Sequence, residues 1–378
     1  MTHQTQEYDV VIAGGGLAGR SLACFLSREP ALTGARILIV DDAGDPYPHR
    51  SLIYWHDDAL PLPLTPEAAF TSLAVDAGAA PRVLPLRRHR LCLTSSRAVF
   101  RCLDDVIDGN PRITRLDARV ARVRARAGSA EVVLSDGRRL TASHCFDSSL
   151  PPTGITAPLL MSGEVRRVRT AHDAFDPSTA TFIDFRSGAR HPVHFHCVLP
   201  ISAREAVVEV TRIVPGTAPD AGFSFDRATS AYLRTVWGVS RYSSVSVERG
   251  SIPLGVRPGP ARGRHVRIGS PSGVVKATTG YGFTRILRQT RHIASTLAST
   301  GSPETPRPSP RFRWYDRPVL RMWERDPELA VEFMRAAFTA GDADLVLDFL
   351  DERTTFAQER GLLGSMPVRM LLQPRLWT

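Results

Sequence analysis

Residues 8–26, YDVVIAGGGLAGRSLACFL, decide how this chain begins to fold. The continuous apolar run Val10–Ile12 predicts a strand that is buried on both faces of a parallel sheet. Three glycines with the spacing G-x-G-x-x-G begin where that run stops, and an apolar segment follows from Leu17. The stretch therefore predicts a strand, a glycine turn and a helix.

Each glycine of this turn has a separate task in a dinucleotide-binding fold. Gly14 allows the tight turn, Gly16 lets the backbone approach a pyrophosphate, and Gly19 lets the helix lie against the strand. The first amides of the helix, at Leu17 and Ala18, then face the phosphates. The alternative is a glycine-rich turn without a ligand.

A second strand over residues 36–42, RILIVDD, supports the dinucleotide interpretation because it ends in acids. Asp41 or Asp42 would accept a hydrogen bond from the ribose hydroxyl. A hairpin around Asp136-Gly137 and a short strand over 144–149 then return the chain to the sheet. This order favours FAD over a simple NAD domain.

Composition limits the class of protein. The 378 residues suit two domains, and 43% hydrophobic with 23% charged residues is typical of a soluble globular protein. We find no apolar run of about 18 residues and no secretory signal in residues 1–8, and we expect a cytoplasmic location. Five scattered cysteines without C-x-x-C argue against disulfides and against a zinc site.

The net charge of +10 is spread along the chain, and its arginine clusters contain no stacking aromatics. We therefore expect that the protein does not bind nucleic acid and that it contacts an anionic membrane peripherally. The alternative is a solvated basic surface without a partner. The single lysine, Lys276, lies in a second glycine-rich segment, 273–282. Either a compact ammonium is needed there or its placement is chance. The oligomeric state is not indicated.

Residues 159–247 predict a different architecture. Strands over 161–168, 180–185, 193–199 and 206–213 resemble one antiparallel sheet, the usual wall of a substrate pocket. His191, His194 and His196 are interpreted as ordinary strand residues, since no further metal ligand is near them, and we predict no metal site.

Glu209 is the strongest catalytic candidate. A period of two places Val207, Glu209 and Thr211 on one strand face. On an apolar wall facing a pocket, the carboxyl would stay protonated and could donate a proton. The alternatives are a solvent-exposed glutamate and one paired with an arginine.

The remaining segments complete the plan. Residues 267–297 predict a strand, a glycine turn and a helix whose first amides face the flavin, with Lys276, Thr279 and Gly280 as cofactor-binding candidates. Helices are expected over 98–107, from an N-cap at Asp326 to Gly341, and over 343–351. The predicted domains are an FAD-binding domain (1–50, 81–150 and 256–300), a substrate-binding β-sheet domain (51–80 and 151–255, after Pro151-Pro152) and a C-terminal helical region (301–378).

Several segments together resemble the FAD-dependent lycopene cyclase family, which shares its architecture with the aromatic hydroxylases. They cover nearly the whole chain: residues 8–19, Tyr54-Trp55, the E-x-T pattern at 209–211, SIPLG at 251–255, KATTGY at 276–281, 315–320, 349–354 and Met366-Pro367. The resemblance implies an α/β fold with a Rossmann-like FAD-binding domain, and a redox-neutral cyclisation that needs reduced FAD, for which NAD(P)H can act as reductant.

The family's chemistry indicates roles for particular residues. Glu209 would protonate a terminal alkene of a linear isoprenoid, with Thr211 beside it and Trp55 as an aromatic face that stabilises the carbocation. Many relatives carry a second acid where this chain has Val210, so a smaller prenylated substrate is an alternative to lycopene. An FAD monooxygenase using NAD(P)H and oxygen is the rival enzyme, and a flavin- or lipid-binding protein without chemistry is the rival class.

Overall fold

The computed structural model describes residues 6–42, 44, 49–57, 60–78, 80–149, 156–187, 193–216, 222–256, 263–306 and 309–364. The expected boundary at Pro151-Pro152, His191 and the Met366-Pro367 motif lie outside these residues.

The first sheet is the predicted dinucleotide-binding sheet. Its order is β8-β2-β1-β11-β10-β9, with β17 beside β11, and β8, β2, β1, β11 and β17 run parallel. The strands are β1 (Gln6–Ala13), β2 (Ile37–Asp41), β8 (Ile113–Asp117), β9 (Val120–Ala125), β10 (Ala130–Leu134), β11 (Arg139–Asp147) and β17 (His265–Arg267). The Rossmann-like fold class is confirmed.

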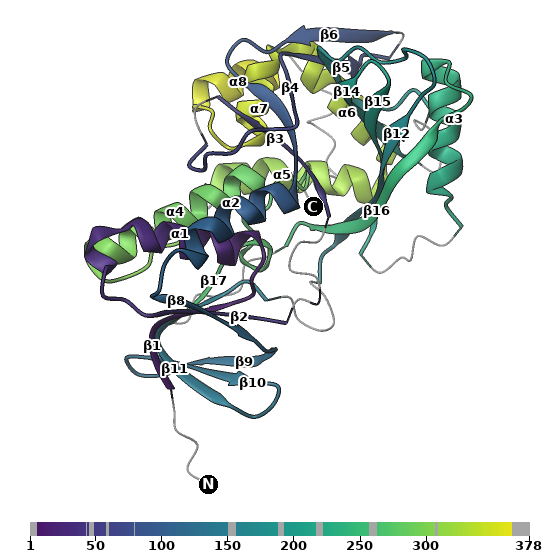
Figure 1. Cartoon of the computed structure of the whole chain (residues 1–378). Helices are drawn as coiled ribbons and strands as arrows, with labels where there is room; N and C mark the ends of the chain where they lie inside the picture. Colours follow the sequence, from purple (N-terminus) through teal and green to yellow (C-terminus); the bar gives the residue numbers. More distant parts are fainter. Residues whose placement is uncertain are drawn as a thin grey trace.

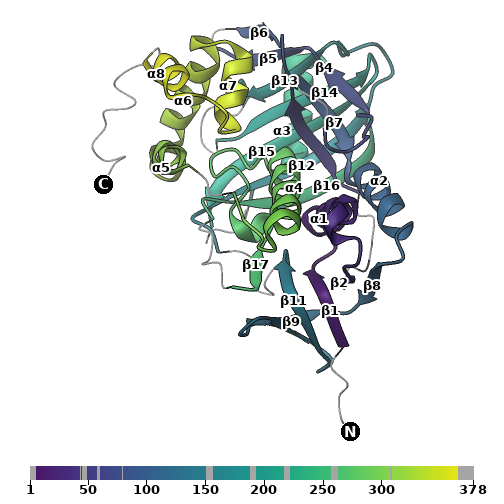
Figure 2. The same ribbon diagram turned by 90° about the vertical axis from the view of Figure 1, so that its left-hand side faces the viewer.

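Strand β1 is buried on both faces, as its apolar run predicts. Val10 and Ile12 pack with helices α1 (Leu17–Arg28), α2 (Ser96–Asp108) and α4 (Phe283–Thr300). Val11 and Ala13 point to the other face and pack in a second cluster with residues of β2, β10 and β11. Figures 1 and 2 show these three helices between the first sheet and the larger sheet described below. The predicted helices over 98–107 and 284–297 are α2 and α4.

The predicted hairpin is present, with Gly137 at φ +89° between β10 and β11. The prediction of a separate strand over 144–149 is wrong, because β11 continues without a break to Asp147. The parallel pairing with β1 extends along nearly all of β11, while its other edge pairs first with β10 and then with β17. One strand therefore serves both the hairpin and the central sheet.

The second large sheet has the order β16-β12-β15-β14-β13-β5-β6. Its strands are β5 (Ser72–Asp76), β6 (Pro81–Pro85), β12 (Leu159–Arg169), β13 (Thr179–Asp184), β14 (Phe195–Ser202), β15 (Glu205–Pro215) and β16 (Ser243–Leu254). The pairing is antiparallel as predicted, except that β13 and β5 are parallel.

One of these strands differs from the expected domain assignment. Residues 81–85, expected in the FAD-binding domain, pair with β5 in the large sheet. Residues 248–254, expected in the substrate-binding β-sheet domain, belong to edge strand β16 of this sheet and pair along β12. A small sheet, β3-β7-β4, links the two parts through β3 (Ser51–His56), β4 (Ala68–Phe70) and β7 (Arg90–Ser95).

The large sheet is covered on both faces. Helix α3 (Phe225–Trp237) packs on the outer face against Val208 and Val198. The C-terminal helices contribute to the core on the inner face, and Figure 2 shows them to the left of the sheet. They are α5 (Pro310–Arg325), α6 (Pro327–Ala340), α7 (Ala343–Leu350) and α8 (Phe356–Gly364).

The start of α6 follows the sequence prediction, since the Asp326 side chain accepts a hydrogen bond from the Leu329 amide at 3.0 Å. Helix α5 is not predicted, because Pro318 lies inside it. Its buried face, which includes Phe312 and Met322, outweighs that local penalty. No helix in the described part of the chain is both long and apolar enough to span a bilayer.

The only lysine of the chain holds a loop against the C-terminal helices. Lys276 is 2% exposed, and its Nζ lies 2.7 Å from Asp316 of α5 and 3.2 Å from Glu352. The backbone carbonyl of Lys276 also accepts a hydrogen bond from Gly280 at 2.9 Å, and its amide donates to Tyr281 at 2.9 Å. The loop 276–281 is thereby anchored at its first residue.

We expect Lys276→Met to lower the free energy of unfolding by about 3–5 kcal/mol, because it leaves the buried carboxylate of Asp316 without its ammonium partner, whereas Glu352 keeps Arg285 at 3.2 Å. Urea unfolding followed by circular dichroism measures this. The matched control is Arg313→Met, on the exposed surface of α5. Equal stability of the two variants would contradict the anchoring role.

A second prediction concerns Gly19. A Cβ at this position would lie 2.0 Å from the carbonyl oxygen of Gly14, so Gly19→Ala must push α1 away from β1. We expect a loss of about 1–3 kcal/mol, measured by thermal unfolding of the apoprotein. Gly34→Ala, where a Cβ meets nothing within 4 Å, is the control and should be neutral.

Candidate active site

Two adjoining cavities lie where the two sheets meet. The first has a volume of about 450 Å³ and lies between the inner face of the large sheet and the loop 276–282. The second, of about 420 Å³, lies at the glycine turn of β1 and α1. Leu17, Ser270 and Ile286 line both cavities, so a single elongated ligand can reach from one into the other.

The glycine turn forms one wall of the second cavity, which we call the nucleotide cavity. Gly14, Gly16, Leu17 and Ala18 all line it, whereas Gly19, in the first turn of α1, faces Gly14 and Ile12 of the preceding strand and turn. Gly14 has φ +97°, a conformation that favours glycine. A Cβ on Gly16 would meet no protein atom within 4 Å, which leaves its surface open to a ligand.

The two candidate acids of β2 have different surroundings in this cavity. Asp41 lies beside the glycine turn, since a Cβ on Gly15 would be 2.6 Å from its Oδ2. Asp42 is half-exposed and pairs with Arg119 at 3.3 Å. Because Arg119 already neutralises Asp42, Asp41 is the better placed of the two to accept a hydrogen bond from a ribose.

The nucleotide cavity also contains residues that the sequence analysis does not single out. Gly269, Ser270 and Pro271 follow β17 and line this cavity. Gly269 has φ +64°, and a Cβ there would lie 2.8 Å from the Cβ of Ala18. The feature of the sequence that could have indicated this part of the cavity is Gly269, which follows the end of strand β17 by two residues.

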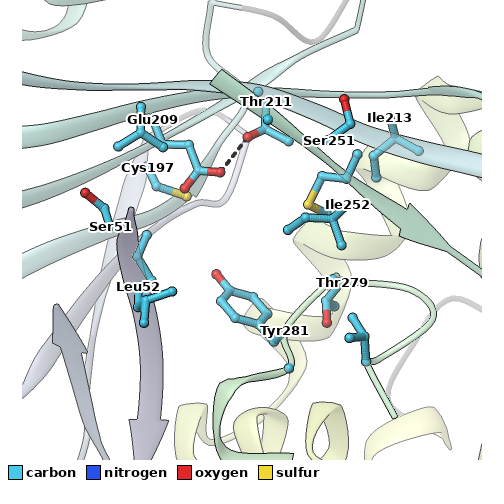
Figure 3. A pocket seen from close by; sticks show the side chains of 18 of the residues that line it. Ser51, Leu52, Cys197, Glu209, Thr211, Ile213, Ser251, Ile252, Thr279 and Tyr281 are labelled. Atoms are coloured by element: carbon cyan, nitrogen blue, oxygen red, sulfur yellow. Dashed lines mark hydrogen bonds between the residues drawn. The ribbon is translucent and has the colours of Figure 1, made fainter. Parts of the chain in front are cut away.

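Glu209 and Thr211 lie on the cavity side of β15, as the alternation predicts. Both line the first cavity, and Figure 3 shows the hydrogen bond of 2.7 Å from Thr211 Oγ1 to Glu209 Oε1. Val208 and Val210 point to the outer face and are fully buried there. The position where relatives carry a second acid is therefore outside the cavity.

The pKa of Glu209 is raised above its ordinary value. Burial in the cavity wall is the main cause, the hydrogen bond from Thr211 opposes it, and the nearby charge of Glu248 raises the pKa further. The wall around the carboxyl is largely apolar, with Val165, Ile183, Phe185, Phe195 and Ile213. Such surroundings favour the neutral, proton-carrying form of the acid.

Of the neighbouring rings Tyr281 and Trp55, Tyr281 lines this cavity and Trp55 does not. Trp55 is 3% exposed and does not line the cavity, and its ring packs edge-on against Tyr281 with a centroid distance of 4.5 Å. Figure 3 shows the Tyr281 hydroxyl directed towards the side where Glu209 and Cys197 lie. Burial raises the pKa of Tyr281 well above its ordinary value, so the phenol stays neutral.

The second glycine-rich segment contributes to the first cavity rather than to the nucleotide cavity. Thr279 and Gly280 line the first cavity, and Gly280 has φ +73°. The Thr279 hydroxyl is buried and has no partner within the described residues, so it is available to a ligand. Lys276 lines neither cavity, because its ammonium is occupied by Asp316 and Glu352.

A second carboxylate in the cavity wall is missed by the sequence analysis. Glu248 of β16 lies in the same cross-strand row as Glu209, with Val165 of β12 between them. It accepts hydrogen bonds from the amide and hydroxyl of Ser51, at 2.8 and 2.9 Å, and contacts His49 at 3.1 Å. The sequence analysis assigns residues 151–255 to the β-sheet domain but predicts no strand at Glu248, so it does not indicate that this side chain faces the cavity.

The histidines of β14 take structural positions. His196 stacks on Tyr232 with a centroid distance of 3.9 Å, and burial lowers its pKa to about 3. Elsewhere in the described chain, Asp57, His89 and Asp348 form a cluster of possible metal ligands. Arg353 bonds to Asp57 at 2.7 Å and Arg88 to Asp348 at 2.6 Å, so arginines already balance these carboxylates.

Comparison with solved structures identifies the same overall fold in proteins of low sequence identity. A geranylgeranyl bacteriochlorophyll reductase-like protein from Thermoplasma acidophilum is 12% identical, with a TM-score of 0.62 and coverage of 96% of both chains. The halogenase PltM, solved with phloroglucinol and FAD, is 12% identical, with a TM-score of 0.56 over 91% of this chain and 82% of its own.

The p-nitrophenol 4-monooxygenase PnpA from Pseudomonas putida is 11% identical, with a TM-score of 0.55 over 99% of both chains. No curated protein sequence matches the chain significantly. The model of the family described as lycopene cyclase protein matches residues 9–376. Since this match covers nearly the whole length, the chain belongs to the lycopene cyclase family.

Proposed function

We propose that this protein is an FAD-dependent, redox-neutral cyclase that protonates a terminal alkene of a linear isoprenoid and closes a six-membered ring. The observation that carries the proposal is the carboxyl of Glu209, whose pKa is raised on the apolar wall of a cavity. Protonation of an alkene needs an acid that keeps its proton at neutral pH and a site that excludes water.

The nucleotide cavity fits an FAD. Gly16 presents open backbone, the amides at the start of α1 suit a pyrophosphate, and Asp41 suits a ribose hydroxyl. The residues shared by both cavities would hold the flavin end beside the first cavity. When bound in its reduced form, FAD would supply an electron-rich ring that stabilises nearby positive charge.

The protein's own residues then account for the first steps. Glu209 gives its proton to the terminal alkene, and the hydrogen bond from Thr211 keeps the carboxyl oriented. The tertiary cation is attacked by the neighbouring alkene, which closes the ring. Tyr281 offers a neutral aromatic face to the cation, and Trp55 fixes that ring from behind.

The first cavity suits the end of a prenyl chain. Its volume of about 450 Å³ lies within the usual range for small ligands. Among its lining residues, Gly250, Ser251 and Ile252 on edge strand β16 are exposed, with Ile252 40% exposed, so the rest of a long chain can leave there. Lycopene is the first choice of substrate and a smaller prenylated molecule the second.

We expect Glu209→Gln to abolish ring formation, because glutamine cannot supply the proton. The assay is anaerobic incubation with chemically reduced FAD and either lycopene or shorter linear prenylated compounds, followed by mass spectrometry. A product of unchanged mass and new retention time from the wild type supports the proposal. A product that gains one oxygen atom and requires NAD(P)H and oxygen would instead establish a monooxygenase.

The same variant has a predicted pH signature. Folding raises the pKa of Glu209. The free energy of unfolding therefore falls as the pH rises from the ordinary pKa of a glutamate to the raised pKa in the folded protein. Glu209→Gln should therefore match the wild type in stability at acidic pH and be equally or more stable at neutral pH. Thermal unfolding from pH 4 upward tests this, and a neutral-pH loss would argue against a neutral acid.

Gly16→Ala tests the FAD assignment. The substitution should leave the stability of the apoprotein unchanged, since its Cβ meets no protein atom within 4 Å, yet weaken FAD binding at least tenfold. Flavin fluorescence titration and thermal unfolding of the apoprotein measure the two effects. Unchanged FAD affinity would show that the flavin phosphates lie elsewhere.

A further inference from the structure

A ring closure that begins with a proton must also end with one. After closure the positive charge lies on a different carbon from the one that was protonated, and a neighbouring C–H bond must lose its proton for the new double bond to form. Among the described residues that line the first cavity, the two carboxylates are Glu209 and Glu248. The second of these has no role in the steps described above.

The position of Glu248 suits the far side of a bound ring. Glu209 of β15 and Glu248 of β16 both pair with Val165 of β12, so they lie two strand spacings apart on one face of the sheet. At about 4.8 Å per strand, their Cα atoms are about 10 Å apart. Each extended side chain can thus approach a small ring from a different side.

The two carboxyl groups differ in the number of hydrogen-bond donors around them, and this difference suits Glu209 to act as the acid and Glu248 as the base. The Glu209 carboxyl has one hydrogen bond, from Thr211, and an apolar wall. The Glu248 side chain, 9% exposed, accepts two hydrogen bonds from Ser51 and contacts His49. Such donors stabilise an ionised carboxylate, which is the form that can accept a proton.

His49 connects this carboxylate to solvent. Its ring nitrogen lies 3.1 Å from Glu248 Oε1, and its side chain is 43% exposed. A proton taken up by Glu248 can therefore leave without crossing the apolar part of the cavity. Arg249, which also lines the cavity, pairs at 2.8 Å with Glu164, which does not line it. Arg249 therefore does not form the ion pair that would otherwise occupy the carboxylate of Glu248.

We propose that Glu248 is the base that removes the proton from the ring cation, and that His49 passes this proton to solvent. The inference rests on the proposed function. The C–H electron pair becomes the ring double bond, and the proton moves to a carboxylate oxygen of Glu248. One proton enters from Glu209 and one leaves through Glu248, so no electrons are exchanged and no other reactant is needed.

The test compares Glu248→Gln, Glu248→Asp and wild type in the anaerobic assay with reduced FAD and the linear prenylated substrate that the wild type converts. We expect Glu248→Gln to be at least 100-fold slower and to give a changed ratio of ring double-bond isomers or an alcohol formed by water capture of the cation. Glu248→Asp should keep the wild-type isomer at a reduced rate. The matched control is Glu205→Gln, on the same sheet but outside the cavity, which should keep rate and isomer.

The outcomes separate the inference from the function on which it rests. If the wild type cyclises the substrate and Glu248→Gln gives the same rate and the same isomer, the role of Glu248 is overturned and the proposed function stands. A wild type that forms no ring with any substrate overturns both. If Glu248→Gln does not fold, Glu248→Asp and Ser51→Ala decide: slower turnover in both at unchanged FAD affinity supports the base, and wild-type turnover in both overturns it.

Discussion

The burial of one carboxyl group governs the arrangement of this site. Glu209 lies on an apolar wall, where its charged form is costly, and within the described residues it accepts a hydrogen bond from Thr211. The strand alternation that exposes Glu209 to the cavity places Val208 in the outer core under α3 and leaves Val210 fully buried. The acid is therefore fixed by packing on the opposite face of the same strand.

The opposite wall of the cavity depends on a buried ion cluster. The loop that carries Thr279, Gly280 and Tyr281 begins at Lys276, whose ammonium joins it to Asp316 and Glu352. Because these charges are buried, their loss costs more than that of a surface pair. The C-terminal helices thus take part in the site indirectly, by holding the loop that presents Tyr281.

The fold by itself does not specify a reaction. A reductase-like protein, a halogenase and a monooxygenase share the architecture at 11–12% identity, and 845 chains of known structure match it, so the chemistry must be argued from side chains. Here those are a carboxyl whose pKa is raised by burial, an aromatic ring and a second, hydrogen-bonded carboxylate around one largely apolar cavity. Together with membership of the lycopene cyclase family, this set supports the proposed acid-base chemistry.

The sequence by itself determined the elements whose signal is local. The glycine spacing at 14–19, the strand periods of β1 and β15, the N-cap at Asp326 and the motif set that indicates the family can all be read without tertiary contacts. The position of Glu209 and Thr211 on one strand face belongs to this group, because a period of two needs only the strand itself.

Only the tertiary structure decided how distant segments meet. Glu248 faces the cavity because β16 pairs with β12. Tyr281 rather than Trp55 lines the cavity because the loop that carries Tyr281 folds over Trp55. Lys276 binds the carboxylates of Asp316 and Glu352, which lie 40 or more residues away in the chain. Each outcome depends on pairings between residues far apart in the chain. Local propensity contains no information about such partners, which are set by burial and charge in the folded state.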